Sequence, residues 1–157
     1  MDGLCIRKAT EADAAEINKV LKLAFKNYEK AACYNAAKGA LEETYEKTLD
    51  DIKTKLFLVA ELSNEVAGSV RVEIMSDKTA YLSRFSVLPQ YHKYGVGKKL
   101  ISEVFSILES KDIKAVYLHT SLDVKYLINF YEGCGFQVES VSEDKGYKRA
   151  RLKKDLW

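Results

Sequence analysis

The sequence predicts an α/β (α+β) fold with a single mixed, mostly antiparallel sheet of about six to seven strands, flanked by about four helices. Residues 55–87 contain three apolar stretches separated by the short polar turns SNE and SDK, which is typical of an antiparallel meander. Residues 14–25 and 96–108 have apolar side chains at the three- and four-residue spacing of helices. Because no repeat, low-complexity segment or linker interrupts the 157 residues, we expect one domain over 1–157.

The N-terminal third is predicted to form one strand followed by helices. LCIRKA (4–9) suits a first strand, and TEAD resembles a capping box in which Thr10 caps the helix and Asp13 stands three residues on. The helix that follows has its apolar residues at Ala14, Ile17, Val20, Leu21, Ala24 and Phe25. Residues 36–53 are more polar but also favour helix, with apolar positions at Ala40, Leu41, Tyr45 and Leu49.

The rest of the chain alternates strands and helices. The predicted meander consists of KLFLVAEL (55–62), VAGSVRVEIM (66–75) and TAYLSRFSV (79–87). A helix with apolar positions every three or four residues follows: Val96, Leu100, Ile101, Val104, Phe105 and Leu108. AVYLHT (115–120) suits a short strand and DVKYLINFYE (123–132) a helix, after which we expect Gly133 to form a left-handed C-terminal cap. The chain closes with two expected strands, FQVESV (136–141) and YKRARLKKDL (147–156).

Composition excludes several classes of function. The formal net charge is only +2 and basic residues alternate with acidic ones, so we expect no nucleic-acid partner and no membrane-binding basic helix. No apolar run is long enough to span a bilayer, and the first three residues start no signal peptide. Cys5, Cys33 and Cys134 lack metal-ligand spacing and stand apart from His92 and His119, so we expect no metal and reduced thiols in a cytoplasm.

The segment LPQYHKYGVGKKL (88–100) is the strongest candidate for a binding site. It contains the only proline, Pro89, and two of the eight glycines, Gly95 and Gly97. Glycines let a backbone approach a ligand closely, and free amides at a helix start bind anions. Positive charge is added by Lys93, Lys98 and Lys99. The pattern suits a phosphate or pyrophosphate, although it is neither a Walker nor a dinucleotide motif, and a plain strand-to-helix turn is the alternative.

Residues 82–100 resemble motif A of the GNAT superfamily, the acyl-CoA-dependent N-acetyltransferases, in which a strand ends in Val-x-Pro before a glycine-rich turn. The matching positions are Val87, Pro89, Tyr91, Gly95, Val96, Gly97 and Leu100. His92 stands where the family usually has Arg or Gln, and Lys93 replaces the first glycine. CIRKATEAD (5–13), FYEGCGF (130–136) and the closing strand are also similar to family motifs, in the family's order.

This resemblance implies a GNAT-like sheet with splayed central strands that binds acetyl-CoA as cosubstrate. Backbone groups of Phe85, Ser86 and Val87 would hold the pantetheine arm and the acetyl oxygen, with an amide near Val87 as oxyanion donor. Backbone amides of the turn would bind the pyrophosphate, namely those of His92, Lys93, Tyr94, Gly95, Val96, Gly97 and Lys98. Because backbone groups do most of this binding, the departures at His92 and Lys93 leave the mechanism available.

The resemblance also implies catalytic roles. Tyr131 in FYEGCGF matches the family's general acid, and a phenol with a reference pKa near 10 stays protonated at neutral pH and can donate to a thiolate. Packing of a helix onto the sheet is the alternative role. Val124 stands where the family often has an Asn. The general base stays open: Ser83 replaces the family's Glu, which leaves Glu73, His119 or a water chain.

The implied function is transfer of an acetyl group from acetyl-CoA to a primary amine of a small molecule or protein, by direct attack in a ternary complex. The acceptor is expected against the N-terminal helices, whose aromatic and acidic side chains would suit a cationic amine: Phe25, Tyr28, Tyr34, Glu42, Glu43 and Tyr45. The predicted acceptor-binding residues are Tyr28, Glu42, Glu73 and His119. The resemblance allows a homodimer without requiring one. The alternatives are a catalytically degenerate CoA-binding sensor or interaction module, and an unrelated phosphate-binding regulatory domain.

Overall fold

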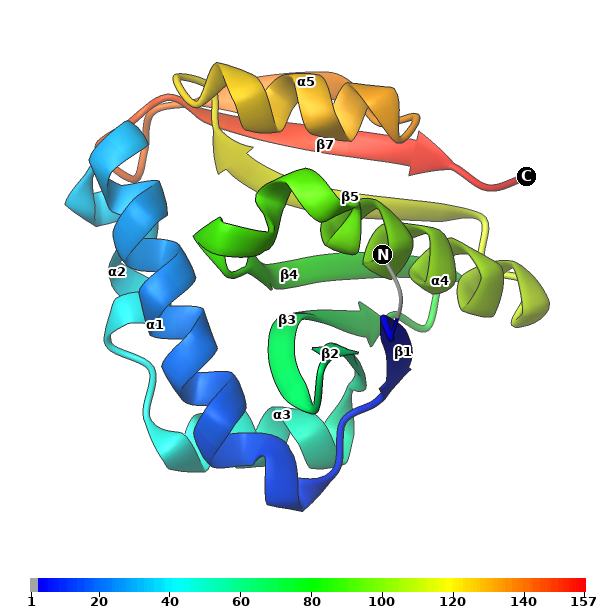
Figure 1. The fold of residues 1–157 in the computed structure, drawn as a ribbon. Coiled ribbons are helices and arrows are strands. Elements are labelled where there is room, and N and C mark those ends of the chain that lie inside the picture. The colour runs from blue at the N-terminus through cyan, green and yellow to red at the C-terminus, as the bar shows by residue number, and fades with distance from the viewer. Residues whose placement is uncertain (1–2) are drawn as a thin grey trace.

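The computed structural model describes residues 3–157, which form one seven-stranded sheet with helices on both faces (Figure 1). The strand order is β1-β2-β3-β4-β5-β7-β6. The strands are β1 (Cys5–Lys8), β2 (Leu56–Leu62), β3 (Glu65–Ile74), β4 (Thr79–Val87), β5 (Ala115–Ser121), β6 (Gln137–Ser142) and β7 (Arg149–Asp155). The first two residues, which are part of the signal-peptide prediction, lie outside the described residues.

The described part of the chain has five α-helices and two short 3₁₀ helices. They are η1 (Glu11–Asp13), α1 (Ala14–Ala31), α2 (Tyr34–Leu41), α3 (Tyr45–Thr54), η2 (Pro89–Tyr94), α4 (Val96–Ser110) and α5 (Lys125–Gly133). One α-helix more than expected forms because the polar segment after α1 folds as two helices. The second begins where the Thr44 side chain accepts a hydrogen bond from the Lys47 N–H at 3.1 Å, an N-cap within the predicted helical segment.

The central strands separate along their length. Among the described strands only β4 and β5 run parallel, and they pair over three residues, from Thr79 opposite Ala115 to Tyr81 opposite Tyr117. Beyond Tyr81 the two strands diverge, and the cavity described below lies in the gap. The predicted fold class, with a mostly antiparallel sheet and splayed central strands, is therefore confirmed.

The helices cover opposite faces of the sheet, as the alternation along β2 shows. Leu58 and Ala60 are buried in one core cluster together with apolar side chains of α4 and α5. Phe57 and Val59, one residue out of phase, are buried in the second cluster with Ile17 of α1. Because successive side chains of a strand point to opposite faces, α1 lies on one side and α4 and α5 on the other.

The predicted capping box is present, but it starts the short 3₁₀ helix η1 that leads into α1, whereas the expected cap at Gly133 is wrong. The Asp13 carboxylate accepts a hydrogen bond from the Thr10 N–H at 2.7 Å. Gly133 is the last residue of α5, and the left-handed residue is Gly135, with φ of 101°. The Gly135 N–H donates to the Glu132 carbonyl and the Phe136 N–H to the Tyr131 carbonyl, both at 3.0 Å. This is a Schellman motif, placed two residues later because Phe136 is buried in the core.

Candidate functional site

A cavity of about 410 Å³ lies where β4 and β5 diverge. We call it the site cavity. Its walls come from α1, β4, the turn into α4, β5, α5 and the start of β7. β4 contains a bulge, because Ser83 pairs with Arg71 while Ser86 pairs with Ser69, so β4 has one extra residue. Arg84 lies within the bulge, with φ of 52°. The bulge breaks the alternation of the strand, so the consecutive residues 82–87 all line the site cavity.

One side of the site cavity is formed by β4 and the turn that follows it. Phe85, Ser86 and Val87, the predicted pantetheine contacts, all line it. The Phe85 ring stacks on Phe130, with ring centroids 5.7 Å apart. His92 Nε2 lies 2.9 Å from the Val87 carbonyl oxygen, so this side chain ties the turn to the end of β4. That contact gives the unusual His92 a positioning role.

The glycines of the turn adopt the geometry that an anion site needs. Gly95 has φ of 74°, in the left-handed region that favours glycine, and it is the N-cap of α4. The first α4 hydrogen bond runs from the Lys99 N–H to the Gly95 carbonyl at 3.1 Å, so the preceding amides have no acceptor within the helix. A Cβ on Gly97 would lie 2.8 Å from the Phe85 ring, so only glycine fits there without moving a wall of the site cavity.

The predicted turn residues divide into two groups. His92, Gly95, Gly97 and Lys98 line the site cavity. The side chains of Lys93, Tyr94 and Val96 do not: Val96 is buried in the core, Lys93 is exposed, and Tyr94 is half-exposed beside Tyr91. Since the role predicted for these three residues uses backbone amides, it stays a prediction.

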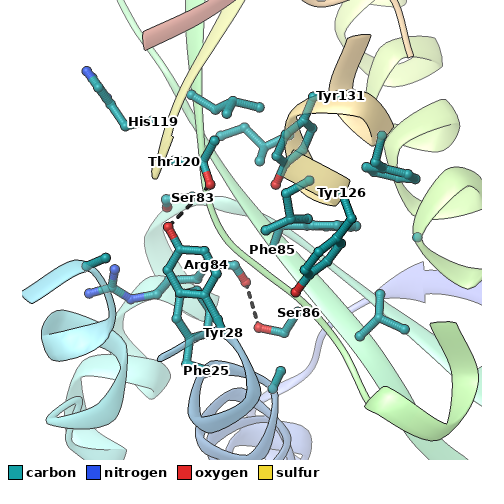
Figure 2. A pocket seen from close by; sticks show the side chains of 18 of the residues that line it. Phe25, Tyr28, Ser83, Arg84, Phe85, Ser86, His119, Thr120, Tyr126 and Tyr131 are labelled. Carbon is teal, nitrogen blue, oxygen red and sulfur yellow. Dashed lines mark hydrogen bonds between the residues drawn. The ribbon is translucent and has the colours of Figure 1, made fainter. Parts of the chain in front are cut away.

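Tyr131 reaches the site cavity from α5 (Figure 2). Only 5% of the residue is exposed, and its ring packs against Phe85, Phe130 and Phe136 at centroid distances of 5.5 to 5.9 Å. Its hydroxyl has no hydrogen-bond partner among residues 3–157, and burial raises the pKa of this phenol above its ordinary value. Tyr131 is therefore protonated at neutral pH, with a hydroxyl free to donate.

The opposite end of the site cavity contains Tyr28 of α1 and His119 of β5. The Tyr28 hydroxyl accepts a hydrogen bond from the Ser121 N–H at 2.8 Å and lies 3.3 Å from Thr120 Oγ1. Burial raises its pKa. His119 Nδ1 lies 2.6 Å from the Tyr81 hydroxyl oxygen. Figure 2 shows the Tyr28 hydroxyl hydrogen-bonded to Thr120, with the His119 ring pointing away from this pair.

The family model described as "Acetyltransferase (GNAT) family" matches residues 18–136. This range includes the site cavity's turn, the β4 bulge and Tyr131. The chain belongs to the GNAT acetyltransferase family.

Curated relatives support the GNAT assignment over part of their length. Uncharacterized protein YyaT of Bacillus subtilis is 32% identical over 77 residues, which cover 49% of this chain and 49% of YyaT. Probable N-acetyltransferase 14 of Xenopus tropicalis is 28% identical over 85 residues, 54% of this chain and 41% of that protein. The matched segment thus covers about half, or less, of each of these two relatives.

Solved GNAT structures match over nearly the whole chain. The PaiA N-acetyltransferase of Thermoplasma acidophilum, in complex with coenzyme A, is 25% identical with a TM-score of 0.85, covering 97% of this chain and 98% of that one. Ard1 of Thermoplasma volcanium has 19% identity and a TM-score of 0.79, covering 99% of both chains, and shows the fold alone. No helix within residues 3–157 is long and apolar enough to cross a membrane.

Two of the four predicted acceptor residues lie outside the GNAT site cavity. Tyr28 and His119 line it, but Glu42 and Glu73 do not, so the cavity brings together only two of the four. Glu42 follows the end of α2, where its carboxylate accepts a hydrogen bond from the exposed Tyr34 hydroxyl. Glu73 is exposed near the end of β3, with its carboxylate 3.9 Å from Lys55 Nζ.

Arg84 and Arg149 were not predicted as site residues, and Glu43 was expected only as one of the acidic groups that would face the acceptor. Arg84 and Arg149 line the site cavity, and Glu43 is buried and hydrogen-bonded to Arg84. No local pattern marks these residues. The bulge in β4 sets the direction of the Arg84 side chain. The position of Glu43 is set by the packing of the turn between α2 and α3 against β3.

The stability of the protein is expected to fall as pH decreases from about 6.5 to about 4, partly because of His119. Burial, with the charges of Arg149 and Arg151, lowers the pKa of this imidazole from 6.5 to about 4. Within that window the unfolded chain binds a proton at His119 and the folded chain does not, so the free energy of unfolding falls with pH. Urea unfolding from pH 4 to 7 measures this dependence. The free energy of unfolding should rise less steeply with pH in His119→Gln than in the wild-type protein. Identical slopes would contradict the assignment.

Proposed function

We propose that the chain transfers an acetyl group from acetyl-CoA to a primary amine by direct attack in a ternary complex. One observation carries this proposal. A glycine-bearing helix start, suited to a pyrophosphate, and an unpartnered, protonated Tyr131 hydroxyl open into one cavity between diverging strands. The complex of the PaiA relative with coenzyme A further supports acetyl-CoA as the donor.

The turn and β4 would bind the donor. The free amides at the start of α4, together with the positive end of the helix dipole, would attract the pyrophosphate, and Lys98 would add a positive charge. The pantetheine arm would follow Phe85, Ser86 and Val87, and an amide near Val87 would stabilise the oxyanion. Gly97 fits this role, because any side chain there would press on Phe85.

Tyr131 would serve as the general acid. The amine nitrogen attacks the thioester carbonyl carbon, the carbon–sulfur bond breaks, and the departing thiolate takes the Tyr131 proton. Because burial raises the pKa of Tyr131, its proton is retained until the thiolate forms. The proton of the attacking amine needs an acceptor. Glu73 lies outside the site cavity, which leaves His119, beside Tyr81, and a water chain.

A thiol-release assay tests the proposal. The purified chain is incubated with acetyl-CoA and amines in separate reactions, with free CoA followed by a thiol reagent and the product by mass spectrometry. We expect thiol release that depends on an amine, and a product heavier by one acetyl group. Tight binding of CoA with no turnover on any amine would instead favour the degenerate sensor, for which the motivating departures are Ser83, His92 and the buried Val124.

A further inference from the structure

The charges of the site cavity are opposite to those expected for a cationic acceptor. Among residues 3–157, no Asp or Glu lines the site cavity, whereas Arg84 and Arg149 do. A polyamine would bring several positive charges to these arginines with no carboxylate to receive them. An acceptor that carries an anion would complement them.

The guanidinium of Arg84 is anchored on one side by a buried carboxylate. Its Nε donates to Glu43 Oε1 at 3.2 Å, and Glu43 in turn accepts two hydrogen bonds, at 2.8 and 2.6 Å, from the fully buried Arg71. Arg71 also pairs with the buried Asp51, which two lysines contact as well, so both buried carboxylates are balanced without Arg84 and its charge is available to a ligand. Its two terminal nitrogens have no acceptor among the described residues, and 31% of its side chain is exposed.

The Arg84 guanidinium is also fixed in position. Figure 2 shows the side chain leaving β4 in the direction of α2. A Cβ on Gly39 of α2 would lie 2.9 Å from Arg84 Nη2, so the absence of a side chain at Gly39 makes space for the guanidinium. Anchored at Nε and packed on α2, the fork is preorganised, and its two free nitrogens match the two oxygens of a carboxylate.

Arg149 supplies a second cation at the same end. It begins β7 opposite Ser121 of β5, and its charge contributes to lowering the pKa of His119. Arg149 forms no ion pair with another described residue. Its charge helps to lower the pKa of the exposed Asp144, but the two side chains are not in contact. Two arginines without a full carboxylate partner thus line the site cavity.

The acceptor end is closed by contacts between distant segments. The Tyr28 hydroxyl on α1 bonds the Ser121 N–H at the end of β5 at 2.8 Å. Asn35 Nδ2 on α2 bonds the Lys145 carbonyl in the β6–β7 loop at 3.4 Å, and Figure 1 shows this loop beside α2. An extended peptide that crossed this end would have to displace these bridges, whereas a small molecule would not.

We propose that the acceptor is a small amine that bears a carboxylate, of the amino-acid class, whose carboxylate binds Arg84 and Arg149. Polyamines and protein N-termini are the acceptors that this arrangement disfavours. The inference rests on the proposed acetyl transfer, and it replaces the cationic acceptor that the acidic side chains of the N-terminal helices suggested.

The test compares amines that differ in the carboxylate. The twenty common amino acids, their carboxamides, putrescine and spermidine are assayed by thiol release at saturating acetyl-CoA. Rates are expressed per unprotonated amine, because a carboxamide changes the amine pKa. We expect at least one amino acid to exceed its carboxamide about tenfold or more in kcat/KM, as a charge-assisted hydrogen bond predicts. Arg84→Gln should abolish that preference and leave acetyl-CoA affinity unchanged, and Arg84→Lys should retain part of it.

Arg151→Gln is the matched control. Arg151 is also an arginine of β7, but it lies over the Tyr117 ring, pairs with Glu139 and does not line the site cavity. Its replacement should keep the carboxylate preference. Equal rates on acid and carboxamide, or faster turnover of polyamines, would overturn the inference while leaving the acetyltransferase function standing.

Calorimetry separates the two proposals if no amine is turned over. Each amino acid is titrated into the CoA-loaded protein. Carboxylate-dependent binding that Arg84→Gln removes would support anion recognition while the proposed acetyl transfer fails. Absence of binding by every amino acid would overturn the inference.

Discussion

Replacing Gly97 with valine is expected to weaken acetyl-CoA binding about 100-fold, by combining overpacking with lost contacts to backbone amides. The cause is local. Even a Cβ would lie 2.8 Å from the end of the Phe85 ring and 3.4 Å from that of Phe130, and these rings stack on each other. Phe85 must therefore move into the site cavity, or the start of α4 must move away from the pyrophosphate. Calorimetry with acetyl-CoA measures the loss.

Two control variants separate this effect from general damage. Gly133→Val makes the same change at another helical glycine, where a Cβ meets nothing within 4 Å, so acetyl-CoA affinity should be retained. Lys93→Ala removes an exposed charge beside the turn and should cost only a few-fold, because single exposed charges contribute little. Wild-type affinity in Gly97→Val would refute the proposed position of the pyrophosphate. A larger loss in Lys93→Ala than in Gly97→Val would show that charge, rather than the amides, dominates binding.

The sequence predicts the fold well because burial on one face of each element leaves a periodic pattern. Along α1, Ala14, Ile17, Val20 and Leu21 are all buried, as their spacing indicates. The polar turns of the meander likewise mark antiparallel pairs that form in the structure. The end of α5 was misplaced because Gly133 and Gly135 are both plausible caps, and the burial of Phe136, a tertiary property, selects the second.

In the candidate site, too, the part set by local geometry could be predicted and the part set by tertiary contacts could not. The turn around Gly95 and Gly97 was predictable, since glycine is demanded by local backbone geometry and close packing. The acceptor end was not, because its charges are set by contacts between segments far apart in sequence. Glu42 and Glu43 are neighbours in the chain, yet their surroundings differ. Glu42 is exposed and accepts a hydrogen bond from Tyr34, whereas Glu43 is buried and accepts hydrogen bonds from Arg71. No local pattern distinguishes them.

Replacing Tyr131 with phenylalanine is expected to lower kcat about 10²- to 10⁴-fold, the range typical of general acid–base catalysis. The change deletes the hydroxyl and keeps the ring that packs against Phe85, Phe130 and Phe136. Because the hydroxyl has no hydrogen-bond partner among the described residues, its loss should leave stability and acetyl-CoA affinity nearly unchanged. Steady-state kinetics with the best acceptor, calorimetry and thermal unfolding measure the three quantities.

Tyr126→Phe is the comparison that makes this test specific. Tyr126 is the other α5 phenol in the site cavity, but about half of it is exposed, and Figure 2 shows its hydroxyl near Ser86 rather than beside that of Tyr131. Its loss should therefore cost far less in kcat. Burial also raises the pKa of Tyr131, so its ionisation should not lower activity up to about pH 9. Unchanged kcat in Tyr131→Phe would show that water protonates the thiolate. A collapse of stability with normal kcat would assign Tyr131 to packing, because a general acid contributes to the reaction and a packed phenol to the fold.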